Sequence, residues 1–282
     1  MTILVMTAPR SRGVGESDLA ILRELSKGEV LRLGANGAEA TSAPDIDLPE
    51  IDGVDFNLVA AVNRRKGLLI ADMDSTVIPV ECIDEMADFA GVGPEVAEIT
   101  NRAMRGELDF VEAMEARVAL IKGLPVSALE DVFQQRITLN PGARTLVRTM
   151  TENAAHTALI SGGFTFFTER VGAAAGFAEN RANTLDEIDG RLTGAMVQPV
   201  LGRQAKLDAL HELCALLGIT TDDAITIGDG ANDLGMIEAA GLGVGHHPKP
   251  LIANAADAVF RHSDLDAALY LQGYTEAEFV TD

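Results

Sequence analysis

Two aspartates one residue apart follow a short apolar run in the second quarter of the chain. The run Leu68–Ala71 leads directly into Asp72-Met-Asp74. An Asp-x-Asp spacing alone is weak evidence, since it recurs in two expected loops, at Asp45/Asp47 and at Asp264/Asp266. After a buried strand, however, two carboxylates repel each other unless a cation or a shared proton relieves the repulsion. Because Mg²⁺ prefers such oxygen ligands, the pattern predicts a magnesium site here.

A third acidic segment follows another apolar run in the last quarter of the chain. It reads Gly228-Asp229-Gly-Ala-Asn232-Asp233 and opens an expected helix. Taken alone, the segment is typical of a turn with an Asn or Asp cap. Parallel strands, however, bring their carboxyl ends to one edge of a sheet. There Asp229 would join Asp72 around a divalent ion, and Asn232 could orient a phosphate group or Asp72.

Two further segments could bind an anion. Ser161-Gly162-Gly163 precedes a helix expected to begin near Phe164. Glycines permit close backbone approach, and N–H groups at a helix start bind anions, although an ordinary tight turn is the alternative. Lys206 lies in the first turn of another expected helix, where a cation opposes the helix dipole and favours a nearby anion. A solvated surface lysine explains Lys206 equally well.

Glu81 and Arg117 lie in the long segment between the first two apolar runs. Arg117 borders an apolar helical stripe with Phe110, and it either extends its charged end into solvent or grips a carboxylate in a cavity. Glu81 follows the first aspartate closely enough to overhang the same site, although a surface glutamate would be unremarkable. His246-His247 suggests a transition metal, but neighbouring prolines and the lack of a third partner favour a structural loop.

The elements that must position these residues form an α/β pattern. Unbroken apolar runs, each followed by a helical pattern, indicate parallel strands buried on both faces. The five runs are Leu68–Ala71, Thr157–Ile160, Ala224–Ile227, Leu242–Val244 and Ala258–Phe260. We expect a doubly wound, Rossmann-like parallel sheet over residues 67–282. A helical cap over about residues 81–138 and a β-hairpin flap turning at Asp189-Gly190 interrupt the pattern.

Residues 1–66 are expected to form a small N-terminal α+β domain of undefined role. The sequence predicts a strand at Ile3–Met6, a helix capped by Ser17, a loop over residues 34–53 and a helix at Val54–Val62. The basic run Arg64-Arg65-Lys66 marks the expected boundary. Packing and dimer contacts are the simplest uses of this domain, and a homodimer is one possibility.

The composition limits the partners. The chain carries 43 acidic and 22 basic residues, a formal net charge of -21, which repels nucleic acid and anionic membrane surfaces. No apolar stretch approaches the roughly 18 residues of a membrane helix, and the N-terminal run is too short for a signal peptide. Cys82 and Cys214 cannot build a disulfide framework, which favours a cytoplasmic location. An anionic substrate would need local positive charge from a metal, Lys, Arg or helix N-termini.

Taken together, the motifs resemble the haloacid dehalogenase superfamily of phosphatases in their order and strand contexts. The resemblance covers about residues 67–272. It implies that Asp72 attacks phosphorus and that Asp74 protonates the leaving oxygen and then activates water. It implies phosphate binding by Ser161, the Gly162 N–H, Lys206 and Asn232. It implies Mg²⁺ binding by Asp72, the main-chain carbonyl of Asp74 and Asp229, with Asp233 orienting Lys206 or the metal shell.

Within the superfamily, the cap resembles that of the phosphoserine phosphatases, through Glu81, the run Met104–Phe110 and Arg117. The resemblance implies hydrolysis of O-phospho-L-serine to L-serine and phosphate, the last step of serine biosynthesis. Glu81 and Arg117 would pair with the substrate's ammonium and carboxylate, and Phe110 and Met104 would close over it. The alternatives are action on another small phosphate ester, transfer to another acceptor alcohol, or a non-catalytic binding protein, which the filled chemical positions disfavour.

Overall fold

The centre of the molecule is a six-stranded parallel sheet. The computed structural model describes residues 1–26 and 28–281, with the exception of the Met104 side chain. The strands lie in the order β12-β11-β10-β5-β6-β7. Their bounds are β5 Leu68–Ala71, β6 His156–Phe164, β7 Glu179–Asn183, β10 Ala224–Gly228, β11 Leu242–His246 and β12 Ala258–Phe260. The five predicted runs are confirmed as strands, whereas β7 was missed because its sequence, Glu-Asn-Arg-Ala-Asn, carries no apolar run.

Helices cover both faces of this sheet, because its central strand is apolar on both sides. All four residues of β5 are buried; Leu68 and Ile70 pack into one core cluster, Leu69 and Ala71 into another. The first cluster contains residues of α8 Gln204–Leu217, α9 Leu234–Ala239 and α10 Pro250–Ala255. The second contains residues of α6 Ala143–Glu152, α7 Thr165–Ala175 and α11 Ala267–Leu271. The doubly wound class is therefore confirmed.

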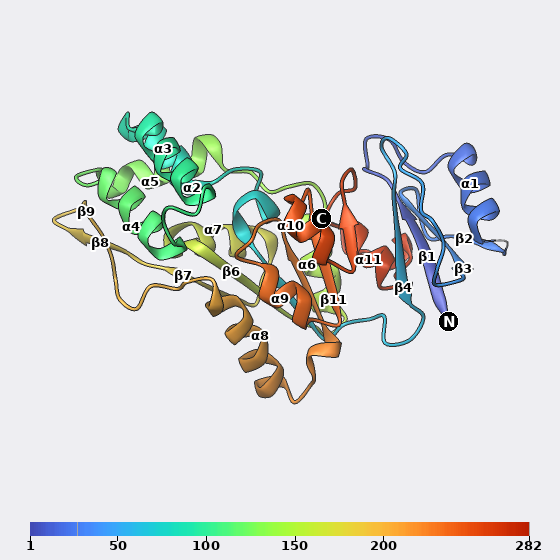
Figure 1. Ribbon diagram of the computed structural model, residues 1–282. Helices are drawn as coiled ribbons and strands as arrows, with labels where there is room; N and C mark the ends of the chain where they lie inside the picture. The colour runs from blue at the N-terminus through green and yellow to red at the C-terminus, as the bar shows by residue number, and fades with distance from the viewer. Residues whose placement is uncertain (27, 282) are drawn as a thin grey trace.

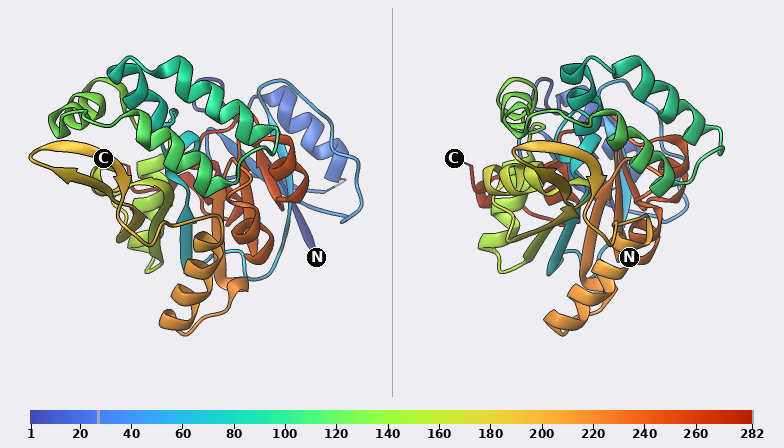
Figure 2. Two further views of the ribbon diagram at one scale, coloured as in Figure 1. Left: turned by 60° about the vertical axis from the view of Figure 1, so that its left-hand side comes forward. Right: turned by 90° about the vertical axis from the view of Figure 1, so that its left-hand side faces the viewer.

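Two insertions lie over one end of the sheet, as Figures 1 and 2 show. Four helices follow β5, namely α2 Cys82–Ala90, α3 Gly93–Met104, α4 Phe110–Leu120 and α5 Val126–Arg136. The predicted hairpin consists of β8 Leu185–Ile188 and β9 Arg191–Met196, and β9 packs against α4. Asp189 and Gly190 between them both have positive φ, 52° and 72°, which a tight hairpin turn requires.

A second, antiparallel sheet forms from the first sixty residues. Its order is β2-β3-β1-β4, from β1 Thr2–Thr7, β2 Val30–Arg32, β3 Gly37–Ser42 and β4 Asp55–Ala60, with α1 Glu16–Ser26 on one face. Single 3₁₀ turns occur at Thr221–Asp223 and Glu276–Glu278.

Three predictions in this region were wrong. The expected loop over residues 34–53 contains β3, and the expected helix over residues 54–62 is β4. Ser17 does not cap α1, which begins at Glu16. Instead, Asp18 accepts a hydrogen bond from the Gly15 N–H at 2.8 Å and pairs with Arg12 at 2.9 Å. The division of the chain after residue 66 stays a prediction.

The reason why β4 was misread lies in its partner, β12. The Asn57 side chain accepts from the Val259 N–H at 2.8 Å and donates to the Val259 carbonyl at 3.2 Å. The Asp55 carboxylate accepts the N–H groups of residues 261–263, at 2.8–3.0 Å. These two buried polar side chains take the place of a neighbouring strand along the edge of the parallel sheet, a contact with distant residues that the local pattern of β4 does not report.

Candidate active site

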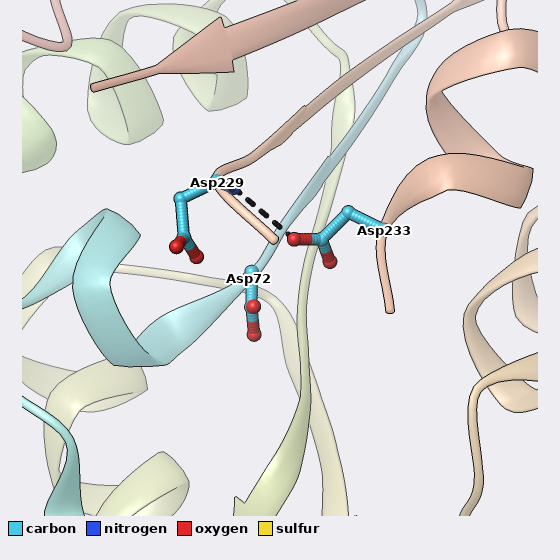
Figure 3. Close-up of side chains that lie close together, drawn as sticks. All are labelled: Asp72, Asp229 and Asp233. Carbon is cyan, nitrogen blue, oxygen red and sulfur yellow. Dashed lines mark hydrogen bonds between the residues drawn. The ribbon is translucent and has the colours of Figure 1, made fainter. Parts of the chain in front are cut away.

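Three buried aspartates converge beyond the carboxyl ends of two neighbouring strands. β5 and β10 are parallel neighbours, and the N–H of Asp72 donates to the Ile227 carbonyl at 2.9 Å. Asp72, Asp229 and Asp233 each offer a carboxylate oxygen, and these atoms lie within 4.8 Å of one another (Figure 3). A set of hard carboxylate oxygens fits Mg²⁺ by its chemistry.

Lys206 neutralises part of this cluster. Its ammonium lies 2.7 Å from Oδ1 of Asp72 and 2.5 Å from Oδ1 of Asp233, and its side chain is 4% exposed. The other oxygen of Asp233 accepts the N–H groups of Asp229 and Gly230 at 3.1 and 3.0 Å. Burial alone would lower the pKa of Lys206, but the charges of Asp233 and Asp72 outweigh it and raise that pKa. Lys206 is therefore a fixed, charged group and not a solvated surface lysine.

Asp72 is held through one of its two oxygens. Oδ1 accepts from the Met73 N–H at 2.7 Å as well as from Lys206, whereas the closest donor to Oδ2 is the Asn232 amide at 3.4 Å. Burial and the neighbouring Asp233 raise the pKa of Asp72 well above its usual range. Among the residues that the structure describes, Oδ2 thus keeps free lone pairs.

Asp74 stands on a strained turn, next to the strand end. Ser75, which follows it, has φ of 57°, an uncommon value for a residue with a side chain. Asp74 Oδ1 accepts from the Cys82 N–H at 2.8 Å, and Oδ2 accepts from the Ser161 hydroxyl at 3.0 Å. Burial raises the pKa of Asp74 above its ordinary value. The turn thus aims a second carboxyl into the site beside Asp72.

The Ser161-Gly162-Gly163 segment lies inside β6, which extends to Phe164, and the helix expected to begin near Phe164 begins at Thr165. The Gly163 N–H donates to the Ser161 hydroxyl at 2.8 Å and is not free for an anion. A Cβ on Gly163 would lie 2.7 Å from Asp74 Oδ2, and one on Gly162 would lie 2.6 Å from the Phe110 ring. The glycines therefore allow close approach, as predicted, but within a strand.

Residues of the cap line the site on the side opposite the sheet end. A cavity of about 380 Å³ is lined by Asp72 and Asp74 below and by Glu81, Phe110 and Arg117 from the cap side. Arg117 donates to the Ala113 carbonyl at 3.3 Å and has no ion pair among the residues that the structure describes. Burial lowers its pKa, an effect that Asp84 and Glu81 partly oppose. Met104, the other predicted cap contact, has its side chain outside the described part of the chain.

The comparisons with known proteins agree with this geometry. Residues 69–238 match the family model described as haloacid dehalogenase-like hydrolase. The chain belongs to this hydrolase family. A phosphoserine phosphatase of Polaromonas is 43% identical over 232 residues, which are 80% of this chain and 94% of that protein.

Two further relatives of this haloacid dehalogenase-like hydrolase differ in how much of their length is shared. A phosphoserine phosphatase of Streptomyces coelicolor is 43% identical over 80% of this chain, but the match spans only 55% of that protein. The crystal structure of a probable phosphoserine phosphatase from Vibrio cholerae, in unliganded form, superposes with a TM-score of 0.78 at 30% identity. That match covers 96% of this chain and 86% of the other, so the likeness extends over the N-terminal sheet as well.

The hydrolase cavity also contains residues that the sequence reasoning missed. Lys249 lies 3.0 Å from Asp229 Oδ2 and lines the cavity, as do Asp84 and Arg203. Lys249 follows β11 by three residues, in the His-His-Pro-Lys-Pro segment that was interpreted only as a structural loop. Inspecting the end of this fourth run, next to β10, would have found it. Asp84 and Arg203 follow no strand and gave no comparable signal.

No described helix combines the length and the apolar character that spanning a lipid bilayer requires.

Proposed function

We propose that this chain is a Mg²⁺-dependent phosphoserine phosphatase, which hydrolyses O-phospho-L-serine to L-serine and phosphate. One observation carries the proposal: a single cavity joins an aspartate pair and a buried lysine at the sheet end to an acid and an arginine from the cap. The names of the relatives support the same substrate.

Asp72 is the proposed nucleophile, acting through Oδ2. Oδ1 is occupied by Lys206 and the Met73 N–H, which fix the carboxylate, whereas Oδ2 keeps lone pairs that can reach phosphorus. In the first step the Oδ2–P bond forms and the bond between phosphorus and the serine oxygen breaks. The product is an aspartyl phosphate, which water then hydrolyses.

Asp74 is the proposed acid and base of the two steps. Its buried carboxyl has a raised pKa and so retains a proton more readily than a surface aspartate. It would give that proton to the departing serine oxygen. The resulting carboxylate would then take a proton from the attacking water. The hydrogen bonds from Cys82 and Ser161 orient the group for both transfers.

The phosphate would be held at the sheet end by Lys206, Ser161, the Gly162 N–H and Asn232. Asp72, Asp229 and the main-chain carbonyl of Asp74 would hold Mg²⁺, with Asp233 fixing Lys206. When bound, the ion supplies positive charge that reduces the repulsion between an anionic nucleophile and a dianionic phosphate. The net charge of -21 repels an anionic substrate, and this local positive charge would offset that repulsion.

The cap supplies the proposed recognition of the serine moiety. The half-buried Arg117 has no carboxylate within ion-pair distance in the described residues, so a substrate carboxylate can take that place. Glu81, which accepts from the Ser75 hydroxyl at 2.7 Å, can bind the substrate ammonium. Phe110 and Met104 are proposed to close over the bound amino acid.

The test replaces the nucleophile and keeps its shape. We expect Asp72→Asn to lower Mg²⁺-dependent phosphate release from phosphoserine by about 10⁴-fold or more, because an amide oxygen is a poor nucleophile. Asp45→Asn is the matched control, since Asp45 belongs to an exposed Asp-x-Asp pair. Adding EDTA to the wild type should abolish the release.

The covalent step has its own measurement. Beryllium fluoride should form its adduct on Asp72 in the wild type, and peptide mapping would locate it. An adduct on any other residue, or an Asp72→Asn variant with near wild-type turnover, contradicts the proposed mechanism.

We also propose a cytoplasmic location, supported by two cysteines that are both buried and unpaired, Cys82 and Cys214. A homodimer is proposed only as one use of the N-terminal sheet, and light scattering of the purified chain tests it.

A further inference from the structure

Lys249 occupies a position that the proposed chemistry does not use. Its main-chain N–H donates to the Asp229 carbonyl at 2.9 Å, and its ammonium lies 3.0 Å from Asp229 Oδ2. Lys249 is thus anchored on Asp229 by its backbone and paired with it by its side chain. It lines the same cavity as Asp72 and Glu81.

The two lysines of the carboxylate cluster differ in their freedom. The Lys206 side chain is 4% exposed and lies between Asp72 and Asp233. Its departure would leave these buried carboxylates without a positive partner, which is energetically costly. The Lys249 side chain is 60% exposed and pairs with a single oxygen of Asp229. Although Asp229 is buried, solvent around the exposed Lys249 ammonium screens the pair, so only modest free energy holds the two together.

Charge balance explains why a second lysine is needed. The carboxylates of Asp72, Asp229 and Asp233 are crowded within one small volume, and Lys206 touches only two of them. Without a cation, Asp229 would face Asp72 and Asp233 with its own charge unopposed. Lys249 supplies that cation from the chain itself.

We propose that Lys249 is an exchangeable counter-ion, which pairs with Asp229 while the divalent site is empty and leaves it when Mg²⁺ binds. This inference depends on the magnesium site of the proposed function. Lys249 pairs with a carboxylate oxygen of Asp229, and Asp229 is one of the three residues whose carboxylates could hold a divalent ion. The freed ammonium remains in the cavity, where its charge acts on the Glu81 carboxylate.

The first experiment observes the release of Lys249 directly. The full-length chain is treated briefly with an amine-acylating reagent, with EDTA or with saturating Mg²⁺, and modified lysines are quantified by peptide mass spectrometry. We expect Mg²⁺ to raise the acylation of Lys249 by about two- to five-fold, the size expected for loss of an ion pair whose lysine is exposed to solvent. Lys206 should stay protected in both conditions. Unchanged or lower labelling of Lys249 overturns the proposal.

The second experiment measures the competition. Titration calorimetry with Mg²⁺ alone is run on the wild type, on Lys249→Met and on Lys122→Met, whose exposed lysine does not line the cavity. We expect Lys249→Met to bind Mg²⁺ about two- to five-fold more tightly, and Lys122→Met to match the wild type. Added salt should reduce the difference in Mg²⁺ affinity between the wild type and Lys249→Met, because it screens the pair of Lys249 and Asp229.

The outcomes separate the two proposals. Weaker or unchanged Mg²⁺ binding by Lys249→Met overturns the exchange, since Lys249 would then support the bound ion or ignore it. If the wild type binds no Mg²⁺, both the proposed magnesium site and the proposed exchange are contradicted. If the wild type binds Mg²⁺ but the labelling of Lys249 does not change, only the exchange is contradicted. Thermal unfolding in EDTA checks that Lys249→Met is folded.

Discussion

The sheet end and the cap face the same cavity but hold their charges in different ways. At the sheet end, buried acids have partners in the chain: Lys206 joins Asp72 and Asp233, and Lys249 joins Asp229. In the cap, Arg117 and Glu81 form no ion pair with any residue that the structure describes.

The difference follows from what each region must do. Groups that carry out a reaction must be fixed before the substrate arrives, and internal ion pairs and hydrogen bonds fix them. Groups that select a substrate gain most when the substrate itself supplies the missing partner. We therefore expect substitutions at the sheet end to reduce turnover of every phosphate ester, and substitutions in the cap to discriminate between esters.

The largest effect is expected at Asp74. Asp74→Asn keeps the size of the side chain but cannot transfer the proton, so kcat should fall by about 10²- to 10⁴-fold for phosphoserine and for simpler phosphate esters alike. Phosphate release under saturating substrate measures this, with Asp84→Asn as the control for an acid that lines the cavity from the cap. A fall below tenfold would mean that Asp74 is not the proton donor.

The next effect tests the cap. Arg117→Ala should reduce kcat/KM for phosphoserine by about 30-fold or more, because the substrate carboxylate loses a charged partner. It should leave phosphoethanolamine, which has no carboxylate, nearly unaffected. Arg102→Ala, in an exposed part of α3, is the matched control. Equal losses of kcat/KM on both substrates would contradict the assignment of Arg117 to substrate recognition. They would also contradict the proposed difference between the sheet end and the cap.

A smaller effect is expected in the N-terminal sheet, outside both the sheet end and the cap. A Cβ on Gly37 in β3 would lie 2.5 Å from the ring of the buried Tyr270. Gly37→Ala should therefore lower the free energy of unfolding by about 1–3 kcal/mol, measured by urea denaturation. Gly67→Ala is the control, since its Cβ would meet only Ile219, at 3.9 Å. Turnover of the folded Gly37→Ala protein should match the wild type, and a lower kcat would show that the N-terminal sheet influences the site.

The smallest effect concerns acid stability at the sheet end. Burial lowers the pKa of His246 to about 3, and its Nδ1 has no hydrogen-bond partner in the part of the chain that the structure describes. Below pH 6.5 the unfolded chain binds a proton on this histidine and the folded chain does not, so stability is lost as the pH falls. Between neutral pH and pH 5.5 the loss amounts to about 1.4 kcal/mol.

The measurement compares urea unfolding at pH 7.5 and pH 5.5. The wild type should lose about 1.4 kcal/mol more than His246→Met over this interval. His211→Gln, at an exposed position of α8, should behave like the wild type. An identical pH dependence of the wild type and His246→Met would exclude a contribution from His246.

The parallel sheet and the order of its motifs could be read from local sequence alone. Strands buried on both faces need unbroken apolar runs, and β5 is such a run, so the carboxyl end that carries Asp72 was predicted correctly. The cap helices and the hairpin turn at Asp189-Gly190 were equally visible, because helical periodicity and turn chemistry are local properties.

The remaining features depend on contacts between residues that lie far apart in the chain. β4 was misread because Asn57 pairs with the backbone of β12 and Asp55 with the residues just after it, some 200 residues later, and no local pattern reports such partners. Which oxygen of Asp72 is free, and that Lys249 reaches Asp229, depend on side-chain packing across neighbouring strands. Local sequence determines which helices and strands form. The charge environment of the site depends instead on how closely side chains that are far apart in the sequence approach one another in the fold.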